Sequence, residues 1–168
     1  MRQVYTDGAV RLGNPGLCSA AYVVYNDDGT KLYESGRVLS DGVHTNNEAE
    51  YAGLIDFLLW ADSHGYRNTM IHSDSQLVVE QVNQRYSCEG ALKPKMCLAY
   101  GLLIRGGHVL RHVHGHNGIV GNERADALCN ETLDQWTNDP NNQSKFAQFV
   151  LDTEKGKNGN TKSVVPVA

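Results

Sequence analysis

The hydrophobic pattern of the chain changes its period near residue 48, and this change constrains the fold more than any other feature. Before it, short apolar runs at 2–6, 19–26 and 31–39 are separated by Gly, Asn and Asp, which is typical of strands and turns. After it and before Gly65, apolar residues recur at the spacing of an amphipathic helix. These residues are Tyr51, Leu54, Ile55, Leu58 and Leu59. The pattern predicts a three-stranded antiparallel meander that leads into a helix.

Helical and strand patterns alternate along the rest of the chain. Strands are predicted at 69–73 and 109–113, and helices at 75–85, 94–104 and 122–133. Three strands followed by alternating helices and strands predict an α/β fold, in which helices pack on a mixed sheet. A chain of 168 residues is long enough for one such core.

The composition changes after about Trp136, where Asn, Gln, Lys, Gly and Thr become frequent. Residues 152–162 contain almost nothing apolar. We therefore predict a folded domain over 1–135 and a flexible polar tail over 136–168. The apolar segment 146–151 is interpreted as a loosely attached end, with a docking helix or a partner-binding segment as the alternative.

The overall composition is ordinary for a globular protein, with 40% hydrophobic and 20% charged residues. No apolar run approaches the roughly 18 residues of a membrane span, and no signal-like segment follows Met1, so we expect a soluble, cytoplasmic protein. The four cysteines are scattered and predict reduced, mostly buried thiols. The net charge of −4 gives no support for a polyanionic partner, although acids around bound cations would not repel a phosphate.

Two carboxylates lie at corresponding places in predicted elements. Asp7 closes the first predicted strand before Gly8, and Asp74 follows the strand at 69–73. Each has an ordinary explanation, a turn for Asp7 and a helix N-cap for Asp74. However, carboxylates at the ends of strands of one sheet can lie side by side, which is what a metal site needs.

The first helix offers two further acids, Glu48 and Glu50. Both flank the apolar stripe at similar angles, so the helical period does not choose between them. Residues 45–48 form a capping box, in which Thr45 binds the backbone amide of Glu48 and the Glu48 side chain reaches back. This structural role leaves Glu50 free for the site.

A fourth acid, Asp126, lies in the last predicted helix among apolar neighbours that would draw it toward the core. A carboxylate in such a place is costly unless it is paired or bound to metal. Glu123 is the alternative, but we interpret it as a solvated or salt-bridged surface group because Arg124 is adjacent.

Three histidines, His112, His114 and His116, alternate at the end of a predicted strand. Such spacing can bind zinc. Gly115 nevertheless predicts that the strand ends in a loop there, so we interpret His116 as a mobile acid-base group beside the carboxylates rather than as a metal ligand.

Taken together, these motifs resemble the type 1 ribonucleases H, in order and in spacing, over about residues 2 to 133. The matching segments are Tyr5–Ala9, Gly13–Gly16, Thr45–Tyr51, Ser73–Gln76, Gly115–Gly118 and Asn122–Asp126. The resemblance implies a mixed five-stranded sheet with helices on its faces. It also implies an endonuclease that hydrolyses the RNA strand of RNA/DNA hybrids.

The resemblance assigns roles residue by residue. It implies that Asp7, Glu50, Asp74 and Asp126 bind metal, and that His116 assists proton transfer or product release. It implies contacts with the hybrid for four amide side chains, which are Asn14, Asn46, Asn47 and Gln76. Hard oxygen ligands suit Mg²⁺ or Mn²⁺, and two ions are expected with substrate.

Two features depart from the common bacterial pattern. The segment 86–95 is short and holds only Lys93 and Lys95 as cations, so this chain resembles the short form without a basic protrusion. The loop after Asp7 is one residue longer than usual, which affects the placement of Asn14.

We expect a monomer, with a possible partner for the tail unidentified. The alternative function is a non-catalytic hybrid-binding module with the same fold, which predicts metal-independent binding and no cleavage. A related polynucleotidyl transferase or a domain of a reverse transcriptase is disfavoured, because the chain has no room for a polymerase or integrase module.

Overall fold

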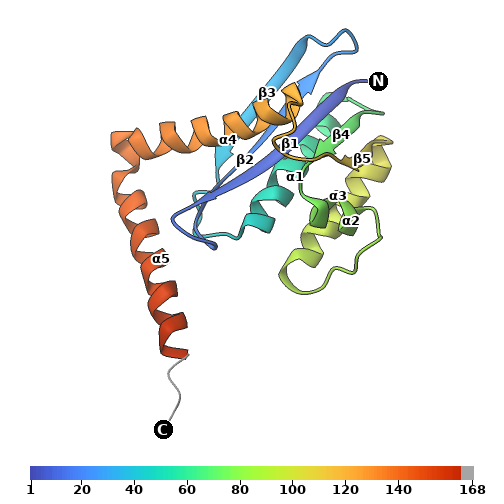
Figure 1. Ribbon diagram of the computed structural model, residues 1–168. Coiled ribbons are helices and arrows are strands. Elements are labelled where there is room, and N and C mark those ends of the chain that lie inside the picture. Colours follow the sequence, from blue (N-terminus) through green and yellow to red (C-terminus); the bar gives the residue numbers. More distant parts are fainter. Residues whose placement is uncertain (164–168) are drawn as a thin grey trace.

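Five strands form one mixed sheet in the computed structural model of the chain (Figure 1). Their bounds are Gln3–Arg11 for β1, Leu17–Tyr25 for β2, Lys31–Val38 for β3, Met70–Ser73 for β4 and Val109–His112 for β5. The strand order is β3-β2-β1-β4-β5, in which the first three strands pair antiparallel and β4 pairs parallel with β1 and β5. The structure describes the backbone of residues 1–163 and the side chains of residues 1–156. The predicted mixed sheet is confirmed.

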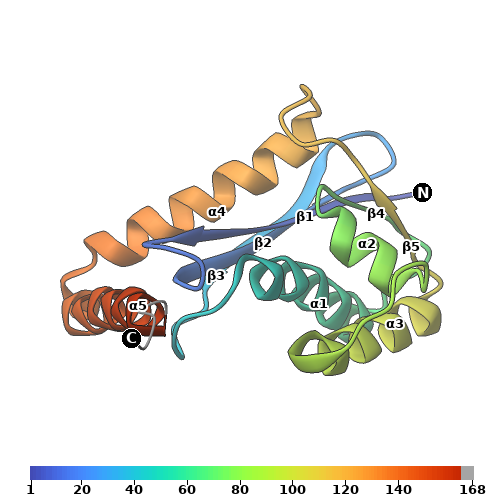
Figure 2. The same ribbon diagram turned by 60° about the horizontal axis from the view of Figure 1, so that its bottom comes forward.

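Helices cover both faces of this sheet. Their bounds are Asn46–His64 for α1, Gln76–Val82 for α2, Lys93–Gly106 for α3, Val120–Asn138 for α4 and Gln143–Ser163 for α5. Figure 2 shows the sheet nearly edge-on, with α4 on one face and α1, α2 and α3 on the other. Short 3-10 turns at Gly90–Leu92 and Pro140–Asn142 precede α3 and α5.

Strand β1 is longer than the sequence predicted. The prediction ended the strand at Asp7, whereas β1 continues to Arg11 because it pairs with β2 along its whole length. This pairing outweighs the turn preference of an Asp-Gly sequence. Strand β4 pairs with β1 only as far as Thr6, so Asp7 is the first residue of β1 beyond its shorter neighbour.

The main core lies between the sheet and helices α1, α2 and α3. It is formed by buried side chains such as Val4, Val24, Tyr51, Leu54, Phe57, Leu58, Ile71, Val78 and Leu103. The predicted stripe of α1 is wrong at Leu59, which is 49% exposed. Phe57 and Ala61 are buried instead, because α1 packs against both the sheet and α3 and so buries more than one stripe.

The C-terminal region is more regular than the irregular tail that we expected over 136–168. Helix α4 extends to Asn138, and α5 follows as far as Ser163, with residues 164–168 outside the described part of the chain. Phe149 of α5 is 4% exposed and packs with Leu17 and Leu133. The interpretation of residues 146–151 as a loosely attached end is therefore wrong, and the segment belongs to a docked helix, which was the alternative. The division of domains at residue 135 stays a prediction.

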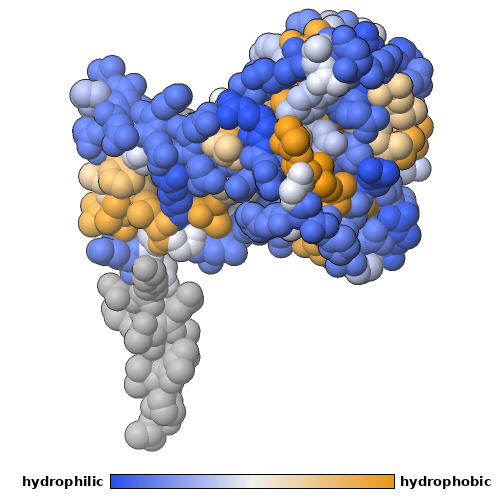
Figure 3. Space-filling view, turned by 45° about the horizontal axis from the view of Figure 1, so that its top comes forward, coloured by the Kyte–Doolittle hydropathy of each residue, from blue (hydrophilic) through white to orange (hydrophobic). Residues whose placement is uncertain are grey.

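The surface is mostly hydrophilic in the view of Figure 3, with several hydrophobic patches, one of which lies at the corner where α4 meets α5. Of the described helices, none has the length and apolar character required to cross a bilayer. Cys18, Cys88 and Cys129 are buried free thiols and Cys97 is an exposed one, which confirms the prediction of reduced, mostly buried cysteines.

Candidate active site

The site begins where the pairing of β1 with β4 ends. The two strands are parallel, and their last paired residues are Thr6 and Ser73. Asp7 and Asp74 each follow the last paired residue, so the shared register places the two carboxylates next to each other. The sequence prediction was wrong in ending β1 at Asp7, but its conclusion that Asp7 and Asp74 converge is confirmed.

Gly8 brings helix α1 against the same point of β1. A Cβ at Gly8 would lie 2.5 Å from the backbone nitrogen of Glu50, and a Cβ at Gly53 would lie 2.5 Å from the carbonyl oxygen of Asp7. Real Cβ atoms do not approach other atoms so closely, so both glycines are required by the contact. Gly8 therefore acts as a packing site for α1 rather than as the turn that the sequence suggested, and no signal in the sequence assigned a role to Gly53.

The N-terminus of α1 confirms the predicted capping box of Thr45 and Glu48. The Thr45 side chain accepts a hydrogen bond from the backbone amide of Glu48, and the Glu48 side chain accepts one from the backbone amide of Thr45, both at 3.2 Å. Glu48 also contacts His44 through a 2.7 Å hydrogen bond. Glu50, two residues after Glu48 in α1, is 6% exposed and lies beside Asp7.

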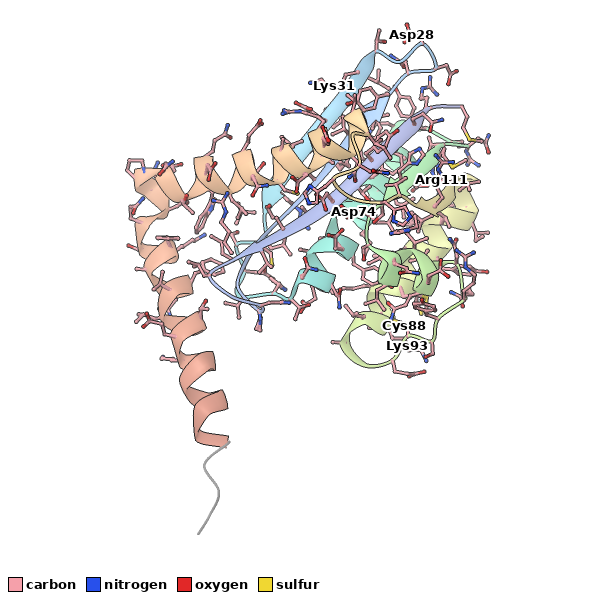
Figure 4. All side chains as sticks on the ribbon, in the orientation of Figure 1. Asp28, Lys31, Asp74, Cys88, Lys93 and Arg111 are labelled. Carbon is pink, nitrogen blue, oxygen red and sulfur yellow. The ribbon has the colours of Figure 1, made fainter. Side chains whose placement is uncertain are left out.

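Three carboxylates, from Asp7, Glu50 and Asp74, form a cluster in which one ligand atom of each lies within 4.8 Å of the others. Figure 4 shows Asp74 near the middle of the molecule, close to the start of α4. Asp7 is 3% exposed, and Asp74 is half-buried. No other group of three or more potential ligands lies this close together among the described residues.

Burial is the main cause of a raised pKa at each carboxyl group of the cluster. Burial and, after it, the charge of Asp74 together raise the pKa of Asp7 from 3.8 to about 7. The pKa of Glu50 is raised well above its usual range by burial and by the charge of Asp7. Burial and the charge of Asp126 raise the pKa of Asp74. The three groups therefore resist simultaneous ionisation unless a positive charge is present.

These residues fit a divalent cation. The Oε2 atom of Glu50 is buried and has no hydrogen-bond partner in the described part of the chain. A bound cation would give this oxygen a partner and would offset the repulsion between the carboxylates. Carboxylate oxygens are the hard ligands that Mg²⁺ and Mn²⁺ prefer.

Asp126 lies on α4, outside the group of three. Its charge raises the pKa of both Asp7 and Asp74. Glu123 is exposed one turn earlier in the same helix. Arg124 pairs with Glu34 and Glu131 at 2.9 Å, so the described contacts do not place it in a salt bridge with Glu123.

His112 is the last residue of β5, and His114 and His116 follow it in the loop that passes beside Asp74. A Cβ at Gly115 would lie 2.9 Å from the Oδ2 atom of Asp74, and the charge of the exposed His116 lowers the pKa of Asp74. The Nε2 atom of His112 lies 3.2 Å from the carbonyl oxygen of Asp74, and the His114 ring lies 5.2 Å from that of His112. His116 is thus next to the acids and accessible to solvent.

The four amide side chains occupy two places around the cluster. Asn14 and Asn46 are exposed and meet through a 2.9 Å hydrogen bond from the backbone amide of Asn46 to the Oδ1 atom of Asn14. Asn47 is half-buried in the first turn of α1, three residues before Glu50. Gln76 is exposed at the first residue of α2, two residues after Asp74.

A family model for RNase H matches residues 2–134 of the chain. The chain belongs to the RNase H family. This membership confirms the family resemblance and the fold predicted from the sequence motifs.

Two relatives illustrate the match to the RNase H family. The ribonuclease HI of Halobacterium salinarum is 38% identical over 132 residues, which are 77% of this chain and 63% of that protein. The crystal structure of RNase H1 from the same organism superposes with a TM-score of 0.71 at 37% identity, over 80% of this chain and 98% of that chain. The chain thus spans just under two thirds of the length of this curated relative.

The second relative, LC11-RNase H1 isolated from compost, was solved in complex with an RNA/DNA hybrid. It matches with a TM-score of 0.66 at 30% identity, over 80% of this chain and 98% of that chain. The family match ends at residue 134, so α5 lies outside it.

Proposed function

We propose that the chain is an endonuclease that hydrolyses the RNA strand of RNA/DNA hybrids. The observation that carries the proposal is the cluster of Asp7, Glu50 and Asp74 in a chain of the RNase H family. Three mutually repelling carboxylates in a partly buried place cost stability, which a protein that only bound a hybrid would have no reason to accept. This cost favours an enzyme over the non-catalytic binding module.

Asp7, Glu50, Asp74 and Asp126 would hold Mg²⁺ or Mn²⁺, with two ions when substrate is bound. The bound ions would supply charge that favours the in-line attack of water on phosphorus and the departure of the 3′-oxygen. The buried carboxylates fix the place of this chemistry, since Asp7 of β1 and Glu50 of α1 are buried where the two elements pack together. No nucleophilic side chain is required.

His116 would move protons at the edge of the site. It is exposed and lies beside Asp74, so its imidazole can exchange protons with water and with the leaving oxygen of the RNA strand. His116 takes no part in binding the cation in this scheme. Its role is therefore separate from that of the four acids.

Substrate recognition is assigned to Asn14, Asn46, Asn47 and Gln76. Amide side chains can reach 2′-hydroxyls and base edges in a wide, shallow minor groove, which distinguishes an RNA strand without reading its sequence. The hydrogen bond from Asn46 uses only the Oδ1 atom of Asn14. The Nδ2 group of Asn14 has no partner among the described residues. Asn47 lies three residues before Glu50 in α1 and Gln76 two residues after Asp74, so both belong to segments that also carry the acids.

The site assignment is tested by a matched pair of variants. Asp74→Asn removes one carboxylate of the cluster, and Glu123→Gln neutralises an exposed carboxylate of the neighbouring helix. We expect Asp74→Asn to lower the rate of hybrid cleavage in Mg²⁺ by at least about 100-fold, since even outer partners of metal ligands contribute about 10–100-fold. Glu123→Gln should retain the rate. Equal rates for both variants would refute the assignment.

Two further expectations accompany this proposal. A monomeric state and a cytoplasmic location stay predictions. Sedimentation of the purified chain would measure the first, and fractionation of the source cells would measure the second.

A further inference from the structure

Helix α5 lies outside the part of the chain that matches the RNase H family, yet it is placed beside the candidate substrate contacts. Figure 1 shows the first half of α5 passing the turn that joins β1 and β2, while its second half extends away from the body. Figure 2 shows the same proximity from another side. The residues of α5 that face the body therefore define what this helix can do.

Phe149 anchors α5 to the domain. It is 4% exposed and forms a buried cluster with Leu17, the first residue of β2, and with Leu133 of α4. Val43, in the segment between β3 and α1, packs against this cluster. The cluster that contains Phe149 therefore connects α5 with residues next to both segments that carry the candidate substrate contacts, and Phe149 is its buried member from α5.

Thr153, one turn after Phe149, contacts the turn between β1 and β2. It is 8% exposed, and its Cγ2 methyl group lies 3.0 Å from the position that a Cβ of Gly13 would occupy. Its hydroxyl donates a 2.7 Å hydrogen bond to the carbonyl oxygen of Phe149 within the helix. The methyl group is therefore the part of Thr153 that faces the turn.

The turn between β1 and β2 has a strained backbone, which contacts from other segments can stabilise. Leu12 and Gly13 have φ angles of +72° and +134°. A leucine rarely adopts a positive φ, because its Cβ then lies too close to the backbone. Residues 12–15 are exposed. The contact with Thr153 limits the number of conformations open to this turn.

The turn between β1 and β2 is also linked by hydrogen bonds to the start of α1. Gly16 and His44 exchange two backbone hydrogen bonds of 2.9 and 3.0 Å, and Asn14 accepts the hydrogen bond from Asn46. A displacement of the turn would therefore move Asn14 and Asn46 together. Both are candidate contacts with the hybrid.

We propose that α5 is part of the substrate-binding apparatus, in which Phe149 and Thr153 are positioning residues that hold Asn14 and Asn46 in place for the RNA/DNA hybrid. This inference rests on the proposed function. On this proposal α5 affects the affinity for the hybrid and does not affect the chemistry at the carboxylates. A docking surface for another protein would instead leave the affinity for the hybrid independent of Phe149 and Thr153.

The test is steady-state cleavage of a hybrid by the full chain and its variants. Phe149→Ala should raise KM by about 2- to 10-fold, the effect of ordering one or two side chains at an interface, and should leave kcat within about 2-fold. Leu151→Ala is the matched control, because Leu151 lies on the same helix and is 51% exposed. Phe149→Leu should restore most of the affinity.

A second pair of variants separates the contact from the stability of the helix. Thr153→Ser keeps the hydroxyl and removes the methyl group that faces Gly13, whereas Thr153→Val keeps a methyl group and removes the hydroxyl. The inference predicts a higher KM for Thr153→Ser than for Thr153→Val. The reverse order would overturn it.

The remaining outcomes are also decisive. If α5 only stabilised the fold, Phe149→Ala would reduce the folded fraction, which lowers the apparent kcat and leaves KM unchanged. That result overturns the inference while the proposed function stands. If the unsubstituted chain does not cleave the hybrid, the proposed function fails and the inference fails with it.

Discussion

Neutralising Asp7 should stabilise the protein in the absence of divalent metal. The Asp7 carboxyl group is 3% exposed, and burial together with the charge of Asp74 raises its pKa from 3.8 to about 7. A carboxyl group with a raised pKa in the folded state favours folding only in its protonated form. The penalty is therefore absent below about pH 4, grows between the two pKa values and is complete above about pH 7.

The size of the effect follows from the two pKa values. At roughly 1.4 kcal/mol per pH unit, the gap between 3.8 and about 7 corresponds to roughly 4 kcal/mol at high pH. Glu50 shares the same burial and repulsion, and the asparagine of Asp7→Asn leaves a polar group to be satisfied, so we expect a gain of roughly 2 kcal/mol. For a chain of this length, the unfolding midpoint should rise by roughly 4–8 °C.

The assay is thermal unfolding followed by circular dichroism in EDTA, at about pH 8 and about pH 4. Asp7→Asn should gain stability at the higher pH and little at the lower one, and Glu123→Gln, which neutralises an exposed acid, should gain at neither. Adding Mg²⁺ at the higher pH should raise the midpoint of the unsubstituted protein and not that of Asp7→Asn. The reasoning would be refuted by an equal gain at both pH values or by no gain at all.

Further predictions concern packing and pH. Gly8→Ala should lower the free energy of unfolding by about 2–4 kcal/mol, because its Cβ would meet the backbone of α1, whereas Gly101→Ala in α3 meets nothing and should raise it by about 0.5–1 kcal/mol; urea denaturation measures both. Burial lowers the pKa of His44, but hydrogen bonds to Glu48 and Asp41 outweigh it and raise the pKa above 6.5. The stability that His44 contributes is therefore complete below about pH 6.5 and is lost as the pH rises through the folded pKa, so the deficit of His44→Gln in urea midpoint should shrink from about pH 6 to about pH 9.

Local sequence chemistry predicted the parts of the site that depend on neighbours along the chain. The capping box of Thr45 and Glu48 is local, because its atoms lie within one helical turn, and it identified Glu50 correctly as the acid beside Asp7. The period change near residue 48 similarly predicted the order of strands and helices.

Contacts between segments that are distant in the sequence could not be predicted from local sequence patterns. The Asp7-Gly8 pair has the composition of a turn, yet pairing with β2 extends β1 through it and the approach of α1 explains the glycine. Nothing near Gly53 in the sequence signals that it contacts Asp7. The convergence of Asp7 with Asp74 could be predicted only because parallel strands of one sheet end at the same edge.

Helix α5 corresponds to the docking helix that the sequence offered only as the alternative for residues 146–151. Phe146, Phe149, Val150 and Thr153 recur at i, i+3, i+4 and i+7, which is a helical stripe, and Phe149 and Thr153 are the buried members. The many Asn, Gly and Thr residues that follow are poor helix formers and favoured the interpretation as a tail. Packing on Leu17 and Leu133 outweighs that preference in the structure.

We propose that the protein hydrolyses the RNA strand of a hybrid at the carboxylate cluster. The most direct measurement compares three duplexes of identical sequence, an RNA/DNA hybrid, an RNA duplex and a DNA duplex, with each strand labelled in turn and with Mg²⁺ present or chelated. We expect internal cleavage of the RNA strand of the hybrid alone, and only with Mg²⁺. Cleavage of the DNA strand, equal cleavage of the three duplexes or cleavage in EDTA would contradict it.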